Sequence, residues 1–315
     1  MVIPVRHIPA PLRLEPAVQS RYTPKAEGTA LRLWRAHGLG NDYLVLEEGG
    51  PLDSFLVREI CNRNRGMGSD GILEPMPTDH AAVGVRIWNP DGSVAEKSGN
   101  GLRIFARWWV DRRGGPPTFA IDTGFDVVEA EVSAASIAIA MGTATFDPRW
   151  VPVQAPGPVI DAPWTVSDVT LCVTAVGMGN PHIVSFFDDV ELDTLPWRRW
   201  GEALEVEPRF PNRTNVQFAT IRGAVLEIRI WERGAGATLA SGSSACAAAA
   251  AAVETGRLPS GRVTVRMPGG DLFVHVAQDR RIRLEGPVEA VGEMVVDSRW
   301  LASRQASRVE SSSGR

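Results

Sequence analysis

The chain has 315 residues, of which 44% are hydrophobic and 22% are charged, and its formal net charge is −4. These values are typical of a globular protein of about two domains, and a weakly negative chain has no strong attraction to nucleic acid or anionic membranes. The longest apolar run, Ala245 to Val253, is shorter than the ~20 residues of a membrane span. We therefore expect no nucleic-acid partner and no membrane partner.

The cysteines and the two ends of the chain limit the cellular setting. Cys61, Cys172 and Cys246 are too few and too scattered for a disulfide framework or a zinc site, which favours a reducing cytoplasm. Residues 1–30 are rich in proline and lack the apolar segment of a secretory signal, so we predict a mobile arm. Residues 302–315 are rich in serine and arginine, and we predict a disordered tail there.

The first half is predicted to contain short strands, separated by glycine and proline turns, and one principal helix. Residues 83–88 form a strand that ends at the turn Asn89-Pro90-Asp91-Gly92. In residues 101–110 the apolar positions recur at helical spacing, which predicts a helix with one buried face. Ser98 comes directly before this helix.

The second half repeats this plan. Residues 225–231 alternate as a half-buried strand does, and a glycine-rich loop follows. The alanine run 245–252 has very high helix propensity and predicts a helix that packs closely in the core. Ser241 precedes this helix, and residues 263–267 and 272–276 are predicted to be strands joined by a hairpin turn.

Matching motifs occur in the same order in both halves, about 140 residues apart. Trp88 in an Arg-Ile-Trp segment precedes Ser98 by ten residues, and Trp231 in a second such segment precedes Ser241 by ten. A Gly-Leu-Gly-Asn turn is likewise echoed by Gly-Met-Gly-Asn. Three ordered echoes predict a duplicated domain.

The predicted fold is therefore α+β, with two pseudo-symmetric domains, each a curved and mostly antiparallel sheet wrapped around a central helix. We predict an N-terminal domain at residues 31–147, completed by about 288–301, and a C-terminal domain at 148–287. Two related halves that face each other can present one reactive side chain to each face of a single substrate. This is the geometry that a two-base racemase or epimerase needs.

The two predicted helix starts carry small polar residues, Ser98-Gly99-Asn100 and Ser241-Gly242-Ser243. Serine followed by glycine is a common helix cap without any further role. Alternatively, the free backbone N–H groups at a helix start bind a carboxylate, aided by the helix dipole. Because two such starts occupy matched positions, we favour the binding role.

Further polar residues lie in turns or at strand ends beside glycine or proline: Asn41, Asn89, Asn180, Asn215 and the pair Glu232-Arg233. Asparagine in a turn is ordinarily only a turn former. Recurrence in both halves suggests a pocket lined with amides, in which Arg233 pairs with a substrate carboxylate and Glu232 suits an α-ammonium group. His182, in the turn after Asn180, is open to either a structural or a catalytic, pKa-tuning role.

Together these motifs closely resemble the diaminopimelate epimerase family over residues 31–300. The matching segments, in order, are His37-Gly38-Leu39-Gly40-Asn41-Asp42, Asn89-Pro90-Asp91-Gly92-Ser93, Gly99-Asn100-Gly101, Gly179-Asn180-Pro181-His182, Asn212-Arg213-Thr214-Asn215-Val216, Glu232-Arg233-Gly234-Ala235-Gly236 and Pro268-Gly269-Gly270-Asp271. The resemblance implies two domains that close over the substrate, a homodimer, and interconversion of LL- and meso-diaminopimelate for lysine and peptidoglycan biosynthesis. It also implies that no cofactor takes part, neither pyridoxal phosphate nor a metal.

The resemblance breaks where the family has its two catalytic cysteines, because this chain has Ser98 and Ser241 there. The resemblance implies that these serines hold the acid and base positions, with Glu232 and His182 tuning them. The substrate-binding residues that we expect are Asn41, Asn89, Gly99, Asn100, Asn180, Asn215, Glu232, Arg233, Gly242 and Ser243.

A serine hydroxyl is much less acidic than a thiol and is a poor base without a neighbouring one. We therefore expect epimerisation that is impaired or altered. Two alternatives remain open at this point. One is a divergent racemase, isomerase or dehydratase that acts on another amino acid with His182 or Glu232 as its base. The other is a binding homologue without catalytic activity.

Overall fold

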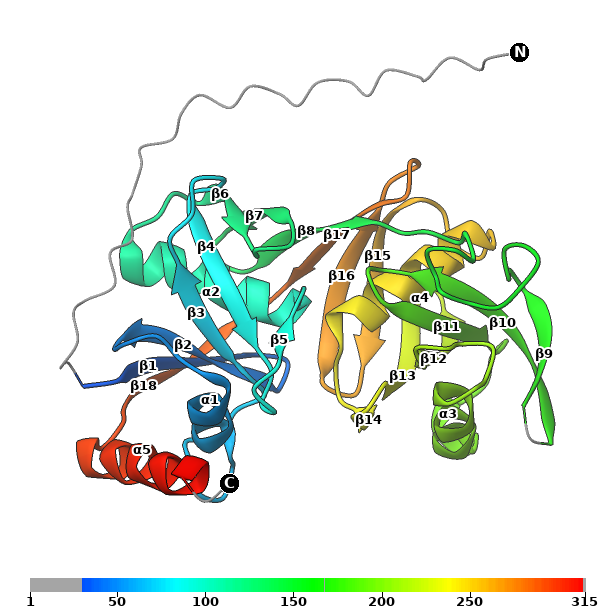
Figure 1. The fold of residues 1–315 in the computed structure, drawn as a ribbon. Helices are drawn as coiled ribbons and strands as arrows, with labels where there is room; N and C mark the ends of the chain where they lie inside the picture. Colours follow the sequence, from blue (N-terminus) through cyan, green and yellow to red (C-terminus); the bar gives the residue numbers. More distant parts are fainter. Residues whose placement is uncertain (1–29, 167, 314–315) are drawn as a thin grey trace, which may run out of the picture.

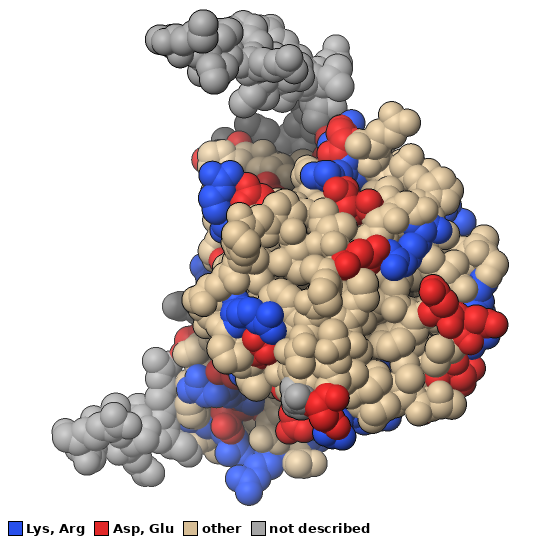
Figure 2. Space-filling model, turned by 90° about the vertical axis from the view of Figure 1, so that its right-hand side faces the viewer, with Lys and Arg blue, Asp and Glu red and all other residues tan. Residues whose placement is uncertain are grey.

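The computed structural model describes residues 30–166 and 168–313, so nearly all of the predicted arm lies outside the described residues. These residues form two lobes, each a sheet around one long helix (Figure 1). No helix in this part of the chain is long and apolar enough to cross a membrane. On the face in Figure 2, basic and acidic side chains are interspersed, without a large patch of either sign.

The N-terminal lobe begins with a hairpin and has a short helix before its third strand. Its elements are β1 (Arg32–Gly38), β2 (Asn41–Glu48), α1 (Ser54–Cys61), β3 (Ile72–Met76), β4 (Val83–Trp88), β5 (Val94–Ala95), α2 (Gly99–Arg113), β6 (Thr118–Asp122), β7 (Val127–Val132) and β8 (Ile137–Thr143). A strand from the end of the chain, β18 (Glu289–Val295), pairs antiparallel with β1 and so belongs to this lobe.

The C-terminal lobe repeats this order of elements with two additions. Its elements are β9 (Ala162–Val166), β10 (Val169–Gly177), β11 (Pro181–Phe186), η1 (Leu192–Thr194), α3 (Trp197–Glu205), β12 (Asn215–Arg222), β13 (Val225–Glu232), β14 (Gly236–Thr238), α4 (Gly242–Glu254), β15 (Gly261–Met267), β16 (Gly270–Val276) and β17 (Arg281–Gly286). The repeat runs from β10 onward, with a further strand, β9, before it and a short 3-10 helix, η1, before α3. The predicted strands and both predicted central helices are present.

Strand pairing repeats from one lobe to the other. The pairs β2–β3 and β11–β12 are parallel, and so are β4–β6 and β13–β15. The hairpins β6–β7 and β15–β16 are both antiparallel, as are β3–β4 and β12–β13. The predicted duplication and the α+β class are therefore confirmed.

The two central helices are buried for different sequence reasons. Helix α2 presents large side chains such as Phe105 and Trp108, and it ends at Gly114, whose φ of +68° is favourable for glycine. Helix α4 is lined by the alanine run 245–252, and every one of these side chains is buried. Because alanine adds little volume, the surrounding strands approach this helix closely. Both helices belong to one hydrophobic core that continues across the two lobes.

The lobes are also joined by backbone hydrogen bonds. Strands β8 and β17, one from each half, pair antiparallel between Ile137–Thr143 and Arg281–Gly286. Leu284 of β17 is fully buried and lies under the first residue of each central helix. This crossing pair fixes where the two helix starts meet.

The predicted disordered tail is wrong for residues 302–313, because they belong to a helix, α5 (Ser298–Ser313). The side chain of Asp297 accepts hydrogen bonds from the backbone N–H groups of Arg299 and Trp300, at 2.8 and 3.1 Å. Trp300 and Leu301 pack against the small apolar cluster between α1 and the first strands. A capped start and two apolar anchors offset a serine-rich composition that on its own predicts disorder.

Candidate active site

The starts of the two central helices meet at the contact between the lobes. Ser98 is the N-cap residue of α2, and Ser241 is that of α4. A Cβ atom at Gly242 would lie 3.4 Å from the Cα of Gly99, and a Cβ at either glycine would lie 2.8 Å from Leu284 Cδ2. A side chain at either position would therefore have to displace the end of Leu284, and glycine avoids this. The serines that precede these two glycines consequently lie at one junction, one from each lobe.

Ser98 is held by two hydrogen bonds. Its Oγ accepts from the backbone N–H of Gly101 at 3.0 Å, as an N-cap serine does. Its Oγ also lies 3.1 Å from the hydroxyl of Tyr43, which is on β2. Burial is the main cause that raises the pKa of Tyr43 to about 12; the hydrogen bond with Ser98 opposes this rise, and the nearby Asp70 and Glu232 carboxylates contribute to it. Ser98 and Tyr43 are thus both protonated hydroxyls near neutral pH.

Ser241 has a different environment. Its Oγ makes no capping hydrogen bond with the helix and instead donates to Glu232 Oε2 at 3.0 Å. Burial is the main cause that raises the pKa of Glu232 above its ordinary value, and the nearby hydroxyls of Thr238 and Ser241 oppose this. A carboxylate that is poorly solvated and bonded to a hydroxyl can accept the proton of that hydroxyl.

Backbone amides remain open at both helix starts. Within the described part of the chain, no acceptor bonds the N–H groups of Gly99 and Asn100 in α2, or those of Gly242 and Ser243 in α4. Such groups, at the positive ends of two helices, favour a bound anion. The arrangement suits a carboxylate placed between the two serines.

A chain of polar contacts supports the N-terminal helix start. Asn41 Nδ2 donates to Asp70 Oδ2 at 2.8 Å, and Asn41 Oδ1 accepts from Asn100 Nδ2 at 3.0 Å. Arg103, fully buried, donates to Asn100 Oδ1 and to the Gly99 carbonyl. Burial lowers the pKa of Arg103 to about 10. This network fixes two of the predicted binding residues, Asn41 and Asn100, beside Ser98.

A second network supports the C-terminal side. Asn215 Nδ2 donates to the Pro181 carbonyl at 2.9 Å, and Asn215 Oδ1 accepts from the Arg233 backbone N–H at 3.0 Å. Asn215 thereby ties the Asn180-Pro181 turn to the segment that carries Glu232. Arg233 itself is exposed, and its guanidinium donates to the Asn212 carbonyl at 3.0 Å. Among the described residues, this guanidinium has no carboxylate partner.

His182 is placed differently from the predicted catalytic or pKa-tuning role. It is fully buried, Nε2 bonds Asn180 Oδ1 at 2.8 Å, and Nδ1 accepts from Gln217 Nε2 at 3.1 Å. Burial lowers its pKa to about 3, so the ring is neutral at physiological pH. A neutral ring with both nitrogens engaged cannot take a substrate proton without breaking this network. Its position instead fixes the orientation of Asn180.

Not every predicted binding residue joins these contacts. The Asn89 side chain donates to Ser93 Oγ at 2.9 Å within its own turn, and no described hydrogen bond links it to the helix starts. Tyr43, Asp70 and Gln217 also belong to the hydrogen-bonded networks around the helix starts, and no sequence motif indicated them. Asn41 and Tyr43 are two residues apart on one strand, so their side chains share a face. That spacing was the available signal for Tyr43.

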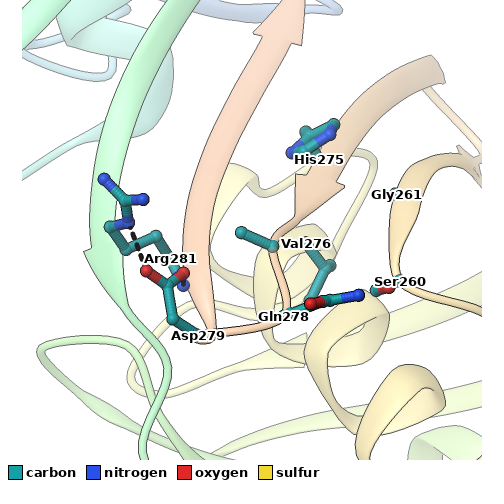
Figure 3. A pocket seen from close by; sticks show the side chains of 8 residues that line it. Ser260, Gly261, His275, Val276, Gln278, Asp279 and Arg281 are labelled. Atoms are coloured by element: carbon teal, nitrogen blue, oxygen red, sulfur yellow. Dashed lines mark hydrogen bonds and ion pairs between the residues drawn. The ribbon is translucent and has the colours of Figure 1, made fainter.

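A separate depression lies on the C-terminal lobe, at the end of β16 and the start of β15 (Figure 3). His275, Gln278, Asp279 and Arg281 line it, and Asp279 pairs with Arg281 at 2.7 Å. The opposite end of the same hairpin contacts Leu39 near the helix starts. The depression is therefore a strand length away, roughly 20 Å, and shares no residue with the serine site.

Comparison with known proteins identifies the family. A family model described as diaminopimelate epimerase matches residues 33–146 and 174–291. The chain belongs to the diaminopimelate epimerase family. Diaminopimelate epimerase 2 of Nostoc sp. is 40% identical over 272 residues, which are 84% of this chain and 94% of that protein. The diaminopimelate epimerase of Desulfitobacterium hafniense is 38% identical over 275 residues, which are 83% of this chain and 96% of that protein.

Solved structures share the fold of this diaminopimelate epimerase family member. A hydroxyproline epimerase from Agrobacterium vitis, with bound trans-4-hydroxy-L-proline, superposes with a TM-score of 0.63 at 16% identity, covering 84% of this chain and 92% of that one. A predicted epimerase from Pseudomonas aeruginosa gives 0.61 at 18% identity, covering 85% and 99%. At this identity the likeness establishes the fold alone.

Proposed function

We propose that this protein is an amino-acid epimerase that inverts one α-carbon of diaminopimelate, between the LL and meso forms, with serines in the two acid and base positions. The observation that carries the proposal is the meeting of two N-cap serines, Ser98 and Ser241, at one junction between duplicated lobes. An inversion needs one proton-transfer group on each face of the α-carbon. Family membership at 40% identity supports the same reaction class.

The open amides of the two helix starts give the reacting carboxylate its place. In this proposal, the N–H groups of Gly99, Asn100, Gly242 and Ser243 hold that carboxylate and stabilise the charge that spreads onto it when the α-proton leaves. The exposed guanidinium of Arg233 holds the distal carboxylate, which is the recognition that selects a diamino-dicarboxylate. Asn41, Asn180 and Asn215 position the surrounding turns through the hydrogen bonds described above.

The serines act through a stronger partner in this proposal. Ser241 cannot be a useful base alone, but Glu232 at 3.0 Å can receive its proton as it takes the α-proton. A carboxylate-backed hydroxyl remains a weaker base than a thiolate, so we propose a slow epimerase. The homodimer and the cytoplasmic location stay predictions.

The test is exchange of the α-hydrogen in deuterium oxide, followed by mass spectrometry, on LL- and meso-diaminopimelate and a panel of other amino acids. Exchange and inversion of diaminopimelate above the level of a Ser98→Ala/Ser241→Ala variant support the proposal. Exchange or loss of water on another amino acid alone would show a divergent isomerase or dehydratase. Tight binding of diaminopimelate without exchange would show a binding protein, and either outcome contradicts the proposal.

A further inference from the structure

The two serines differ in the direction of their hydrogen bonds. We infer that proton transfer is one-directional in the resting protein: Ser241 with Glu232 removes the α-proton, and Ser98 returns one to the opposite face with Tyr43 as its proton-supplying, positioning residue. This inference rests on the proposed function and deepens it. It assigns a role to Tyr43, and it predicts that the two substrate configurations are treated unequally.

The surroundings of Ser98 suit a donor. Its Oγ already accepts the Gly101 N–H, and Tyr43 offers a second hydroxyl at 3.1 Å. If Tyr43 donates to Ser98, the serine oxygen accepts both of these hydrogen bonds. The serine hydroxyl is then left to donate its own hydrogen to the substrate. Hydrogen bonds of this kind stabilise an alkoxide and make the hydroxyl a better acid. No carboxylate bonds Ser98 among the described residues, so the pair starts with both protons and no base.

The surroundings of Ser241 suit an acceptor. Its hydroxyl donates a hydrogen bond to Glu232 Oε2, and its oxygen accepts none from a backbone N–H of the helix. The oxygen lone pairs are therefore free to accept the α-hydrogen while the hydroxyl proton passes to Glu232. Glu232 is half-buried rather than sealed, so the proton that it receives can exchange with solvent.

The steps balance in protons and electrons. The Cα–H bond breaks, its hydrogen goes to Ser241 Oγ, and the previous Ser241 proton goes to Glu232. The electron pair stays on the α-carbon and its carboxylate. Ser98 then gives its proton to the opposite face, a new C–H bond forms, and Ser98 regains a proton from Tyr43. Solvent finally carries one proton from the Glu232 carboxylic acid to the Tyr43 oxyanion, which restores the starting state.

The two halves of the cycle are coupled by charge. The Glu232 carboxylate lies near enough to oppose ionisation of Tyr43, as does Asp70. Once Glu232 is protonated, one of these two repulsions is removed. Proton release from Tyr43 therefore becomes easier after the α-proton has been removed, and this order prevents early loss of the Tyr43 proton.

The experiment separates exchange from inversion on LL- and meso-diaminopimelate in deuterium oxide, with mass spectrometry for exchange and chiral chromatography for inversion. In the wild type, we expect the rate of α-hydrogen exchange to exceed the rate of inversion for one configuration of the reacting carbon and not for the other. Tyr43→Phe keeps the ring and removes the hydroxyl, so inversion should fall by about 10- to 100-fold while that exchange stays within about two-fold. Glu232→Gln should lose both.

Two further variants show whether Tyr43 acts through Ser98. Ser98→Ala should reproduce the effect of Tyr43→Phe, and the double variant should be no worse than either single variant. Thr165→Val is the matched control, because it removes a hydroxyl that pairs with Thr170 at 2.8 Å in an exposed hairpin, and it should leave both rates unchanged. Circular dichroism and thermal unfolding verify that each variant folds.

Equal loss of exchange and inversion in Tyr43→Phe would overturn the inference, because a merely structural role lowers both. Equal exchange in both configurations by the wild type would also overturn it. These results leave the proposed function standing. Absence of exchange by the wild type on any diaminopimelate form would instead contradict the proposed function itself, and the inference with it.

Discussion

The starts of α2 and α4 share a backbone plan and differ in the side chains around it. Each has an N-cap serine followed by a glycine that contacts the opposite helix. At α2 the serine oxygen accepts a hydrogen bond from its own helix, whereas at α4 the serine gives its proton to Glu232. The duplicated fold thus supplies two equivalent positions, and their neighbours give them opposite chemical character.

This difference shows how a symmetric fold can support a directional reaction. The strand pairing that positions the helices is repeated in both lobes, so neither serine is favoured by the backbone. Tyr43 comes from a strand of one lobe, and Glu232 from a strand end of the other. In the proposed reaction, a neutral hydroxyl beside one serine and a carboxylate beside the other separate the proton donor from the proton acceptor.

The largest expected effect comes from replacing both serines at once. In Ser98→Cys/Ser241→Cys, epimerisation of diaminopimelate should rise by about 100-fold or more, because thiols supply both the base and the acid that hydroxyls supply poorly. The epimerisation rate of each single cysteine variant should rise much less, since one of the two proton-transfer groups is still a hydroxyl. Chiral chromatography of the product measures the rate.

A folded but inactive double-cysteine protein would contradict this expectation. It would indicate that the pocket has diverged around the serines. The control is a cysteine placed outside the site, Ser133→Cys, at an exposed turn serine. That variant should leave the rate unchanged and so exclude a general thiol effect.

Arg233→Ala is expected to have a smaller effect, on binding. Diaminopimelate affinity should fall by about 10- to 100-fold, because the distal carboxylate loses a charge-assisted hydrogen bond worth about 1.5–3 kcal/mol. Calorimetric titration with an equilibrated mixture of the two isomers measures it. Arg199→Ala, which removes an exposed partner of Asp168, is the matched control. Unchanged affinity would show that Arg233 only supports the Asn212 turn.

The duplication could be predicted from sequence because it is recorded in short motifs and their spacing. Trp88–Ser98 and Trp231–Ser241 mark a strand, a turn and a helix start, and these local features depend on nearby residues. The helix of alanines was predictable for the same reason. The crossing pair β8–β17 was not, because pairing between strands distant in sequence leaves no local pattern.

The site was predictable as a set of residues, but the hydrogen-bond arrangement within it was not. Sequence motifs indicated Asn41, Asn100 and Glu232, whereas the choice of partner for each serine depends on side chains brought together by the fold. His182 illustrates the limit. Its turn suggested a reactive histidine, and only packing shows that both nitrogens are engaged and buried. Likewise, composition predicted disorder in α5, and tertiary packing of Trp300 overrides it.

The smallest expected effect concerns that buried histidine, and it appears in stability rather than rate. The His182 pKa is about 3 in the folded protein and about 6.5 when unfolded, so the unfolded chain binds more protons between these values. Stability should therefore be full above about pH 6.5 and fall as the pH decreases toward 3. At pH 5 the loss is about 2 kcal/mol relative to pH 8.

His182→Gln removes this titration while leaving a group that can form hydrogen bonds. The variant should be less stable at every pH, because it disturbs the Asn180 and Gln217 contacts, but its unfolding free energy should vary less between pH 8 and pH 5. Chemical denaturation at several pH values measures both quantities. The control His275→Gln, an exposed residue on β16, should keep the wild-type pH dependence. If His182→Gln kept the wild-type dependence of the unfolding free energy on pH, the His182 pKa would be the same in the folded and unfolded protein. His182 would then be protonated in the folded protein at pH 5 and could exchange protons at the C-terminal helix start.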